Sequence, residues 1–253
     1  MTTTIDINSD MGESFGVYTY GQDEAIIRSI SSANLACGFH AGDPTVMKRS
    51  VALAKDAKVA IGAHFGFRDL SGFGRRRLHV KPGDLKNEVS YQLGALAALA
   101  KAENARLHHA KAHGALYMMA LEDDELSRAI VEAVLEFDDS LMIYTIGGSA
   151  TDQMAASKGL RVIREFFADR PYFADGKVKM FDWSLQEIGS TAKAIGRRIR
   201  RLATEGVLLS VDDTELTPAF ETICIHSDTP GSAEIACEVH HALHTAQVRI
   251  EAP

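Results

Sequence analysis

The sequence lacks several features that mark particular classes of protein. It has only three cysteines, Cys37, Cys224 and Cys237, and no C-x-x-C spacing, which fits a reducing compartment better than a disulfide framework. No stretch approaches the about 18 consecutive apolar residues of a membrane span. Residues 1–10 carry neither the basic region nor the apolar run of a signal peptide. We therefore expect a cytoplasmic protein.

Positive charge and nucleotide-binding loops are also lacking. A formal net charge of −7 gives no general attraction to nucleic acids or to anionic membranes, so we expect neither as a partner. The basic run at 197–201 has helical spacing, and we predict that it forms a solvated helix face. Neither G-x-G-x-x-G nor G-x-x-x-x-G-K-[ST] occurs. If ATP is used, it is held in another way or by another chain.

What the sequence does contain is a regular alternation of short apolar runs and longer helical patterns. A chain of 253 residues, of which 46% are hydrophobic, has the size of one barrel-like domain, and no linker divides it, so we predict a single domain over 1–253. The predicted strands are 4–10, 32–38, 59–65, 106–111, 141–147, 161–167 and 222–228. The predicted helices are 22–30, 44–56, 84–102, 123–136, 149–158, 184–204 and 230–245.

This alternation predicts an α/β fold with parallel strands joined by right-handed crossovers. We favour a closed or nearly closed TIM-like (β/α)7 barrel over an open doubly wound sheet, because most strand ends carry polar groups that a barrel gathers into one mouth. Asp43-Pro44 and Thr229-Pro230 each read as a helix N-cap followed by proline. Residues 206–221 predict a small hairpin that turns at Asp212 and Asp213.

Titratable residues follow six of the seven predicted strands. In chain order they are Asp10 and Glu13, His40 and Asp43, His64 with Arg68 and Asp69, Lys111 and His113, Glu165 with Asp169 and Arg170, and His226 and Asp228. Any one of these residues has an ordinary structural explanation. Their recurrence at corresponding points of successive units indicates a shared site, because barrel enzymes place their chemistry at the carboxyl ends of the strands.

These residue types support two kinds of chemistry. Carboxylates beside histidines serve as general acids or bases, and a lysine in the same cavity can polarise a carbonyl or neutralise an oxyanion or phosphate. Alternatively, neutral imidazoles and carboxylate oxygens can hold a divalent metal. That set would comprise Asp10, His40, His64, His113 and His226. No H-x-x-x-H or H-E-x-x-H spacing lies within it, so the sequence leaves a metal undetermined.

Six segments resemble the motifs of the LamB/YcsF family, in the right order and over nearly the whole chain. They are IDINSDMGESFG (5–16), SANLACGFHAGDP (32–44), VAIGAHFGFRDLSGFGRR (59–76), KAHGALY (111–117), REFFADRPY (164–172) and ICIHSD (223–228). The six blocks together are highly specific, although no single one is.

This resemblance implies a barrel of the glycoside hydrolase/deacetylase type and an ATP-dependent hydrolase that opens the lactam of 5-oxo-L-proline to L-glutamate. It further implies that ATP, with Mg²⁺, is bound by or shared with two partner subunits, which resemble 5-oxoprolinase subunits B and C. On this basis we expect catalytic roles for Asp10, His64, Lys111, His113 and Glu165. We expect the substrate to be bound by Glu13, His40, Asp43, Arg75, Arg170, His226 and Asp228.

The sequence departs from the family pattern at several points, which leaves the substrate and the reaction open. Ala112 stands where the family has proline, Pro171 where glycine is common, and Ser227 where it has glycine. The segment VKMFDWSLQEIG (178–189) replaces a P-R-S-x-x-G-A segment. A different cyclic amide is therefore an alternative substrate. The chain could also be a metal-dependent amide or N-acetyl hydrolase that acts alone, or a non-catalytic subunit that binds a small metabolite.

Overall fold

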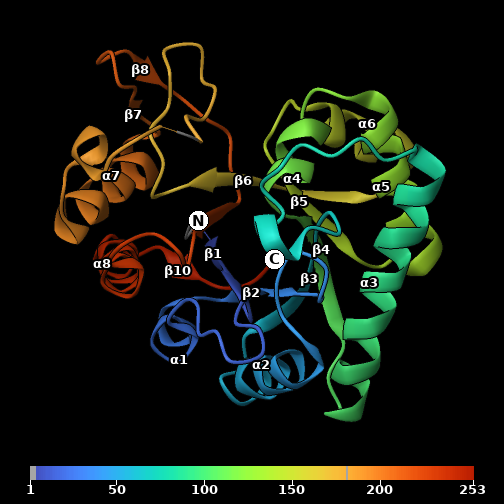
Figure 1. The fold of residues 1–253 in the computed structure, drawn as a ribbon. Coiled ribbons are helices and arrows are strands. Elements are labelled where there is room, and N and C mark those ends of the chain that lie inside the picture. Colours follow the sequence, from blue (N-terminus) through green and yellow to red (C-terminus); the bar gives the residue numbers. More distant parts are fainter. Residues whose placement is uncertain (1–3, 181) are drawn as a thin grey trace.

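The computed structural model describes residues 4–180 and 182–253 and shows a closed barrel of parallel strands (Figure 1). The barrel strands are β1 (Thr4–Met11), β2 (Ser32–Ala36), β3 (Ala60–Phe65), β4 (Leu107–Ala112), β5 (Met142–Thr145), β6 (Arg161–Phe167) and β9 (Thr222–Ile225). Each pairs in parallel with the next, and β9 pairs with both β6 and β1, which closes the ring. The predicted (β/α)7 barrel is confirmed.

Helices surround the barrel in the order in which the chain visits them (Figure 1). They are α1 (Asp23–Ile26), α2 (Pro44–Asp56), α3 (Pro82–Ala102), α4 (Gly114–Ala120), α5 (Asp124–Phe137), α6 (Ala150–Lys158), α7 (Ala192–Glu205) and α8 (Ser232–Thr245). A short strand β10 (Arg249–Ile250) extends the sheet beside β1. Among the described residues, no helix is both long and apolar enough to cross a membrane.

Strand β1 shows why the barrel interior is polar. Side chains alternate between the two faces of a strand, so Ile5 and Ile7 join the apolar core beneath the helices. The residues between and after them, Asp6, Asn8 and Asp10, bond to side chains of other barrel strands. Two buried layers result, an apolar one between strands and helices and a hydrogen-bonded one inside the ring.

The predicted hairpin is confirmed, and it lies outside the barrel. It consists of β7 (Leu208–Leu209) and β8 (Glu215–Leu216), which pair in antiparallel fashion. Asp213 has a φ of 58°, in the left-handed region that tight turns need.

The structure corrects several local predictions. Helix α4 was not predicted, and the predicted helix 184–204 divides into a 3-10 helix, Leu185–Ile188, and α7, with Gly189 left-handed between them. Thr229 does not cap α8, because the N-cap position is Gly231 and the Thr229 hydroxyl is donated to Asp169 instead. Arg198 does not belong to a solvated helix face, since it reaches inward to the carbonyl oxygens of Ala168 and Arg170.

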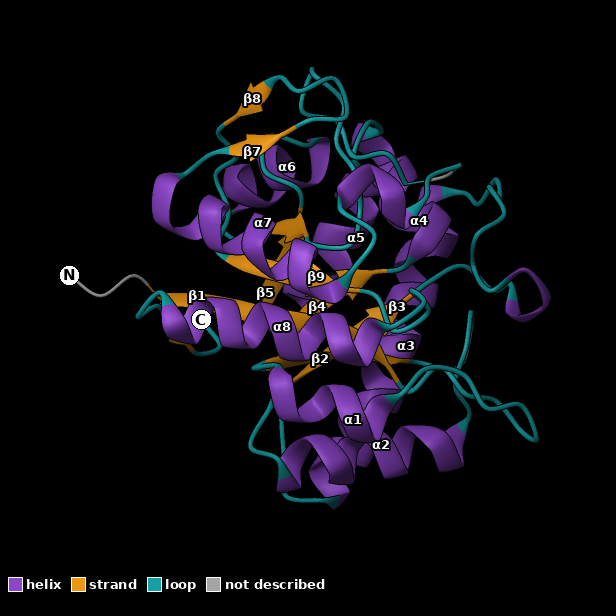
Figure 2. Ribbon diagram, turned by 90° about the vertical axis from the view of Figure 1, so that its left-hand side faces the viewer, coloured by secondary structure: helices purple, strands orange, loops and turns teal. Residues whose placement is uncertain are grey.

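All the parallel strands point the same way, so their carboxyl ends share one rim. In Figure 2, β1 enters the barrel from the left and long loops extend to the right. Close packing fixes part of this rim. The α-carbon of Gly74 lies so near His40 and His113 that an added Cβ would come within 2.7 and 2.8 Å of their atoms, and its φ of 63° favours glycine.

Candidate functional site

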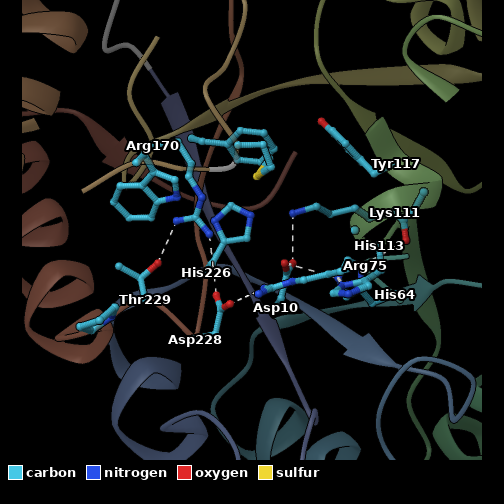
Figure 3. Close-up of a pocket in the computed structure, with 16 residues that line it drawn as sticks. Asp10, His64, Arg75, Lys111, His113, Tyr117, Arg170, His226, Asp228 and Thr229 are labelled. Carbon is cyan, nitrogen blue, oxygen red and sulfur yellow. Dashed lines mark hydrogen bonds and ion pairs between the residues drawn. The ribbon is translucent and has the colours of Figure 1, made fainter. Parts of the chain in front are cut away.

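A cavity of about 160 Å³ opens at the carboxyl ends of the strands (Figure 3). It is lined by most of the residues that the sequence singled out. These are Asp10, His64, Arg75, Lys111, His113, Arg170, His226 and Asp228. They come from loops and strands spread over the whole chain, so the predicted convergence at one barrel mouth is what the structure shows.

Lys111 occupies the floor of this cavity. It extends from β4, and its side chain is only 2% exposed. Its Nζ atom lies 3.0 Å from Asp10 Oδ1, 2.8 Å from Glu165 Oε1 and 3.1 Å from Cys224 Sγ. Burial alone would lower the pKa of Lys111, but Asp10 and its other anionic neighbours outweigh burial and hold the pKa well above its ordinary value. The lysine is therefore a fixed positive charge.

Asp10 stands beside this ammonium group and faces the cavity. Its Oδ1 atom accepts hydrogen bonds from Lys111 and, at 2.8 Å, from Asn34, while Oδ2 lies 3.4 Å from His64 Nε2. Burial would raise the pKa of Asp10, but His64 and Lys111 together hold it well below the ordinary value. His64 and Lys111 therefore favour the ionised carboxylate.

Glu165 lies behind Lys111 rather than in the cavity. Its side chain is fully buried and receives a hydrogen bond of 3.0 Å from the Tyr117 hydroxyl. This places the predicted catalytic Glu165 where it can hold Lys111 in position, with no direct access to a ligand.

Two arginines form the cationic side of the rim. Arg75 bonds to Asp228, and Arg170 lies with Nη2 3.8 Å from the same carboxylate. Burial opposes the charge of Arg75, but Asp228 raises its pKa above the ordinary value. Both guanidinium groups present planar donor sets that suit carboxylate or phosphate oxygens.

Asp169 anchors the loop that carries His226. Its carboxylate accepts hydrogen bonds from the backbone and Nδ1 nitrogens of His226, both at 2.9 Å, and from Thr229 at 2.6 Å. Burial would raise the pKa of Asp169, but Arg170 and His226 lower it below its usual range. The result is a buried network of ion pairs and hydrogen bonds beside the cavity.

The wall next to Arg170 is apolar. Phe167, Met180 and Trp183 line it, and the Arg170 guanidinium lies 4.5 Å from the centroid of the Trp183 ring system. Met180 and Trp183 belong to the segment that departs from the family pattern. Phe181, between them, lies outside the described residues.

Glu13 and His40 lie beside the cavity, in a buried group with His64 and His113. The ligand-capable atoms of these four residues all lie within 4.8 Å of one another. Asp10, Cys224 and His226 form a second such group. The donor atoms of both groups are of the kinds that bind transition metals.

Asp43, like Glu165, is a predicted site residue that the structure places outside both the cavity lining and these groups. It caps α2, because Oδ1 accepts from the backbone nitrogens of Thr45 and Val46, and Oδ2 accepts from Gly16. Those N–H donors lower its pKa. Its role is to fix the loops after β1 and β2.

Sequence reasoning missed three residues around the floor and walls. Tyr117 lies on the unpredicted helix α4, Cys224 was noted only as one of three cysteines, and Trp183 was noted only as part of a departure from the family. Tyr117 and Cys224 fall within quoted motifs, KAHGALY and ICIHSD, so the motifs contained a signal although the strand-end pattern did not.

The chain is similar over nearly its whole length to known proteins. The chain is 43% identical to the 5-oxoprolinase A subunit of Syntrophobacter fumaroxidans, covering 98% of this chain and 97% of that protein. It is 42% identical to the protein of the same name from Bordetella pertussis, with full coverage of both.

Solved structures give the same result for the fold. The lactam utilization protein of Thermus thermophilus superposes with a TM-score of 0.92 at 41% identity, covering 99% of this chain and 100% of that one. A polysaccharide deacetylase from Bacillus cereus shares the fold alone, with a TM-score of 0.50 and 13% identity over 100% of this chain and 92% of the other. The model of the LamB/YcsF family matches residues 5–253, and the chain therefore belongs to the LamB/YcsF family.

Proposed function

We propose that this protein is the A subunit of an ATP-dependent 5-oxoprolinase and that its barrel mouth hydrolyses the activated lactam of 5-oxo-L-proline to L-glutamate. The observation that carries the proposal is the buried Lys111–Asp10 pair on the floor of a small cavity rimmed by Arg75 and Arg170. Full-length relatives that are named as the A subunit of 5-oxoprolinase support it.

The chemistry explains why ATP is needed. An unstrained five-membered lactam resists hydrolysis because amide resonance makes its carbonyl carbon a poor electrophile. Transfer of a phosphoryl group from ATP to the lactam oxygen makes that carbon far more reactive. Water then adds to the carbon, the carbon–nitrogen bond breaks, the ring nitrogen takes up a proton and becomes the amine of glutamate, and further hydrolysis releases phosphate.

The residues of the cavity fit distinct parts of this reaction. Asp10 is ionised and takes the proton from the attacking water. Lys111 stabilises the negative charge that develops on oxygen, since it is held as an ammonium in a buried site. Arg75 and Arg170 bind the substrate carboxylate and the phosphoryl group at the rim.

The remaining predicted residues complete the site around these groups. His226 and Asp228 line the same cavity. Glu165 positions Lys111, and His64 and His113 hold Asp10 and the adjoining loop in place.

We propose that nucleotide binding is shared with partner subunits that resemble 5-oxoprolinase B and C. The absence of a familiar phosphate loop from the sequence supports this division, as does a cavity suited to a small metabolite. ATP, with Mg²⁺, would then meet the lactam at the mouth of the barrel, and we expect no turnover of 5-oxoproline by this chain alone.

The test is to combine the chain with its partner subunits, supply ATP and 5-oxoproline, and measure glutamate and phosphate. We expect equimolar release, which should disappear in Asp10→Ala and Lys111→Ala variants whose circular dichroism matches the wild type. Full activity in both variants would remove these residues from the mechanism.

The same assay separates the competing functions. Turnover of an amide or N-acetyl substrate without ATP or partners would identify a hydrolase that acts alone. Activity confined to another cyclic amide would replace the substrate but keep the chemistry. Ligand binding without turnover in any assembly would identify a binding subunit.

A further inference from the structure

The buried group beside the cavity has the spacing of a metal site. His64 Nε2 lies 3.0 Å from His113 Nδ1, and His113 Nδ1 lies 3.7 Å from Glu13 Oε1. Zinc binds nitrogen and oxygen at about 2.0–2.1 Å, so two of its ligand atoms in a tetrahedral site lie about 3.3 Å apart. These two distances are close to a ligand-to-ligand separation, and all three atoms, which come from β3 and the segments after β4 and β1, lie within 4.8 Å of one another.

The outer nitrogens of both histidines fix which inner nitrogen is free. His64 Nδ1 lies 3.2 Å from the carbonyl oxygen of Lys111, and His113 Nε2 lies 2.8 Å from that of Phe73. A carbonyl oxygen only accepts, so each of these ring nitrogens must carry the hydrogen. In the neutral rings, His64 Nε2 and His113 Nδ1 then each carry a lone pair and no hydrogen. Metal-binding histidines likewise donate the hydrogen of the other ring nitrogen to a carbonyl or carboxylate oxygen.

Two lone pairs that face each other at 3.0 Å repel unless something positive lies between them. A divalent cation satisfies both nitrogens at once.

His40 adds a third imidazole at the edge of the group. It is fully buried, neither of its ring nitrogens has a hydrogen-bond partner among the described residues, and its Nε2 lies 3.8 Å from Glu13 Oε1. Its ring stacks parallel to that of His113, with centroids 3.8 Å apart, so the two rings cannot both point a lone pair at one ion in this arrangement. The set that needs no movement is His64, His113 and Glu13.

The local charge balance also favours a cation. Among the described residues of the mouth, the carboxylates of Asp10, Glu165, Asp169 and Asp228 form ion pairs with Lys111, Arg75 and Arg170. Within that same part of the chain, the carboxylate of Glu13 has no lysine or arginine partner among the ion pairs.

We propose that His64 Nε2, His113 Nδ1 and Glu13 Oε1 bind one divalent transition-metal ion, with His40 and Asp10 beside the site. Two imidazoles and one carboxylate suit zinc and its first-row neighbours, whereas Mg²⁺ prefers oxygen ligands. The inference concerns a binding site of this chain and does not depend on which substrate the cavity takes.

The first experiment uses the full wild-type chain, treated with a chelator and then dialysed. Titration with Zn²⁺ in a calorimeter should show one tight equivalent, confirmed by elemental analysis after gel filtration, and Mg²⁺ should show none. Co²⁺ in place of Zn²⁺ should give the visible absorption bands of a low-coordinate site. Absence of a stoichiometric Zn²⁺ equivalent overturns the proposal and indicates that a shared proton joins the two histidines.

Variants then identify the ligands. His64→Ala, His113→Ala and the nearly isosteric Glu13→Gln should each weaken Zn²⁺ binding by more than the about 10- to 100-fold that loss of a ligand's hydrogen-bond partner costs. His40→Ala should weaken it less. Because Glu13→Gln preserves shape, it keeps the test valid if a histidine variant fails to fold.

Two matched controls locate the binding. His244→Ala removes an exposed histidine of α8, and His226→Ala removes the histidine of the second ligand-capable group. Neither should change the Zn²⁺ affinity. Stoichiometric Zn²⁺ binding could instead persist in Glu13→Gln and His113→Ala and be lost in one of the controls. That result would place the ion elsewhere and refute the proposed site. Since the readout is binding, these results stand apart from the lactam assay.

Discussion

Asp6 and Asp10 are two inward-facing carboxylates on the same strand, β1, at different depths of one barrel. Both are buried, at 1% and 4% exposure. Asp6 accepts hydrogen bonds from the hydroxyls of Ser31, Ser32, Tyr144 and Thr222, at 2.5–3.1 Å. Asp10 instead adjoins the ammonium of Lys111 and the imidazole of His64.

The two environments shift the pKa in opposite directions. Burial raises the pKa of Asp6, and its four hydroxyl donors offset burial only in part. Burial acts on Asp10 as well, but the neighbouring His64 and Lys111 reverse its effect on the pKa. The four hydroxyls thus oppose the effect of burial only in part, whereas Lys111 and His64 outweigh it. We therefore assign a structural role to Asp6, deep in the barrel, and a role in the reaction to Asp10, at the mouth.

Removing the cation should produce the largest effect. Lys111→Met leaves Asp10 and Glu165 without their partner, and breaking a buried ion pair typically costs about 3–5 kcal/mol of unfolding free energy. Activity should disappear as well. Chemical denaturation and the glutamate assay measure the two effects.

Lys158→Met is the matched control for this variant. It removes a lysine that pairs with Glu132 on the surface, where an ion pair contributes about 0–1 kcal/mol. Equal destabilisation by the two substitutions would contradict the assigned role of Lys111.

Exchanging the base should give the next largest effect. Asp10→Asn keeps the shape but cannot accept the proton from water, so kcat should fall by about 10²- to 10⁴-fold, the usual contribution of a general base. Asp6→Asn, made in the same strand, should keep kcat within about threefold by the same reasoning. Steady-state kinetics of the assembled enzyme measure kcat for both variants. Similar losses of kcat in the two would contradict the different roles assigned to Asp6 and Asp10.

Removing the deep carboxyl should alter stability more than activity. Asp6→Ala leaves the buried hydroxyls of Ser32, Tyr144 and Thr222 and the half-buried hydroxyl of Ser31 without this acceptor, and an unsatisfied buried group costs about 1–3 kcal/mol. Equilibrium unfolding measures this loss, with the exposed Ser157→Ala as the control. An unchanged midpoint would show that the deep network contributes nothing to stability.

The smallest predicted effect depends on pH. Burial, followed by Asp10 and Asp228, raises the pKa of Glu13 well above its ordinary 4.5. Above pH 4.5 the unfolded chain loses this proton while the folded chain keeps it, so Glu13 makes the wild type progressively less stable as the pH rises, by at most about 1.4 kcal/mol per pH unit.

Glu13→Gln removes this dependence. With a chelator present, its melting temperature relative to the wild type should be higher at pH 8 than at pH 5, as measured by calorimetry. A difference that is constant with pH, or that shrinks toward pH 8, would contradict a raised pKa.

Much of this architecture could be predicted from the sequence because it depends on periodicity. Alternating strand and helix patterns predicted the barrel, and polar residues after strands such as β1 and β4 identified the mouth. The bond partners could not be predicted, since they depend on which side chains meet across the ring. Asp43 and Glu165 look equivalent to Asp10 in the strand-end pattern, yet one caps α2 and the other lies behind Lys111.

The residues that were missed show the same limit. Helix α4 was not predicted because it begins within two residues of the end of β4, where the strand pattern still dominates. Tyr117, which holds Glu165, was missed with it. Thr229-Pro230 resembles a helix start. The Thr229 hydroxyl, however, donates a hydrogen bond to the buried carboxylate of Asp169 and does not cap α8.

The most direct measurement of the difference between the two layers is a pH titration by ¹³C NMR of protein labelled at aspartate carboxyls, with Asp6→Asn and Asp10→Asn used to assign the two signals. The Asp10 signal should stay at the position of an ionised carboxylate down to a pH well below 3.8, while Asp6 should take up its proton above 3.8. If Asp10 takes up its proton at a higher pH than Asp6, the mouth does not hold an ionised base, and the role assigned to Asp10 is wrong.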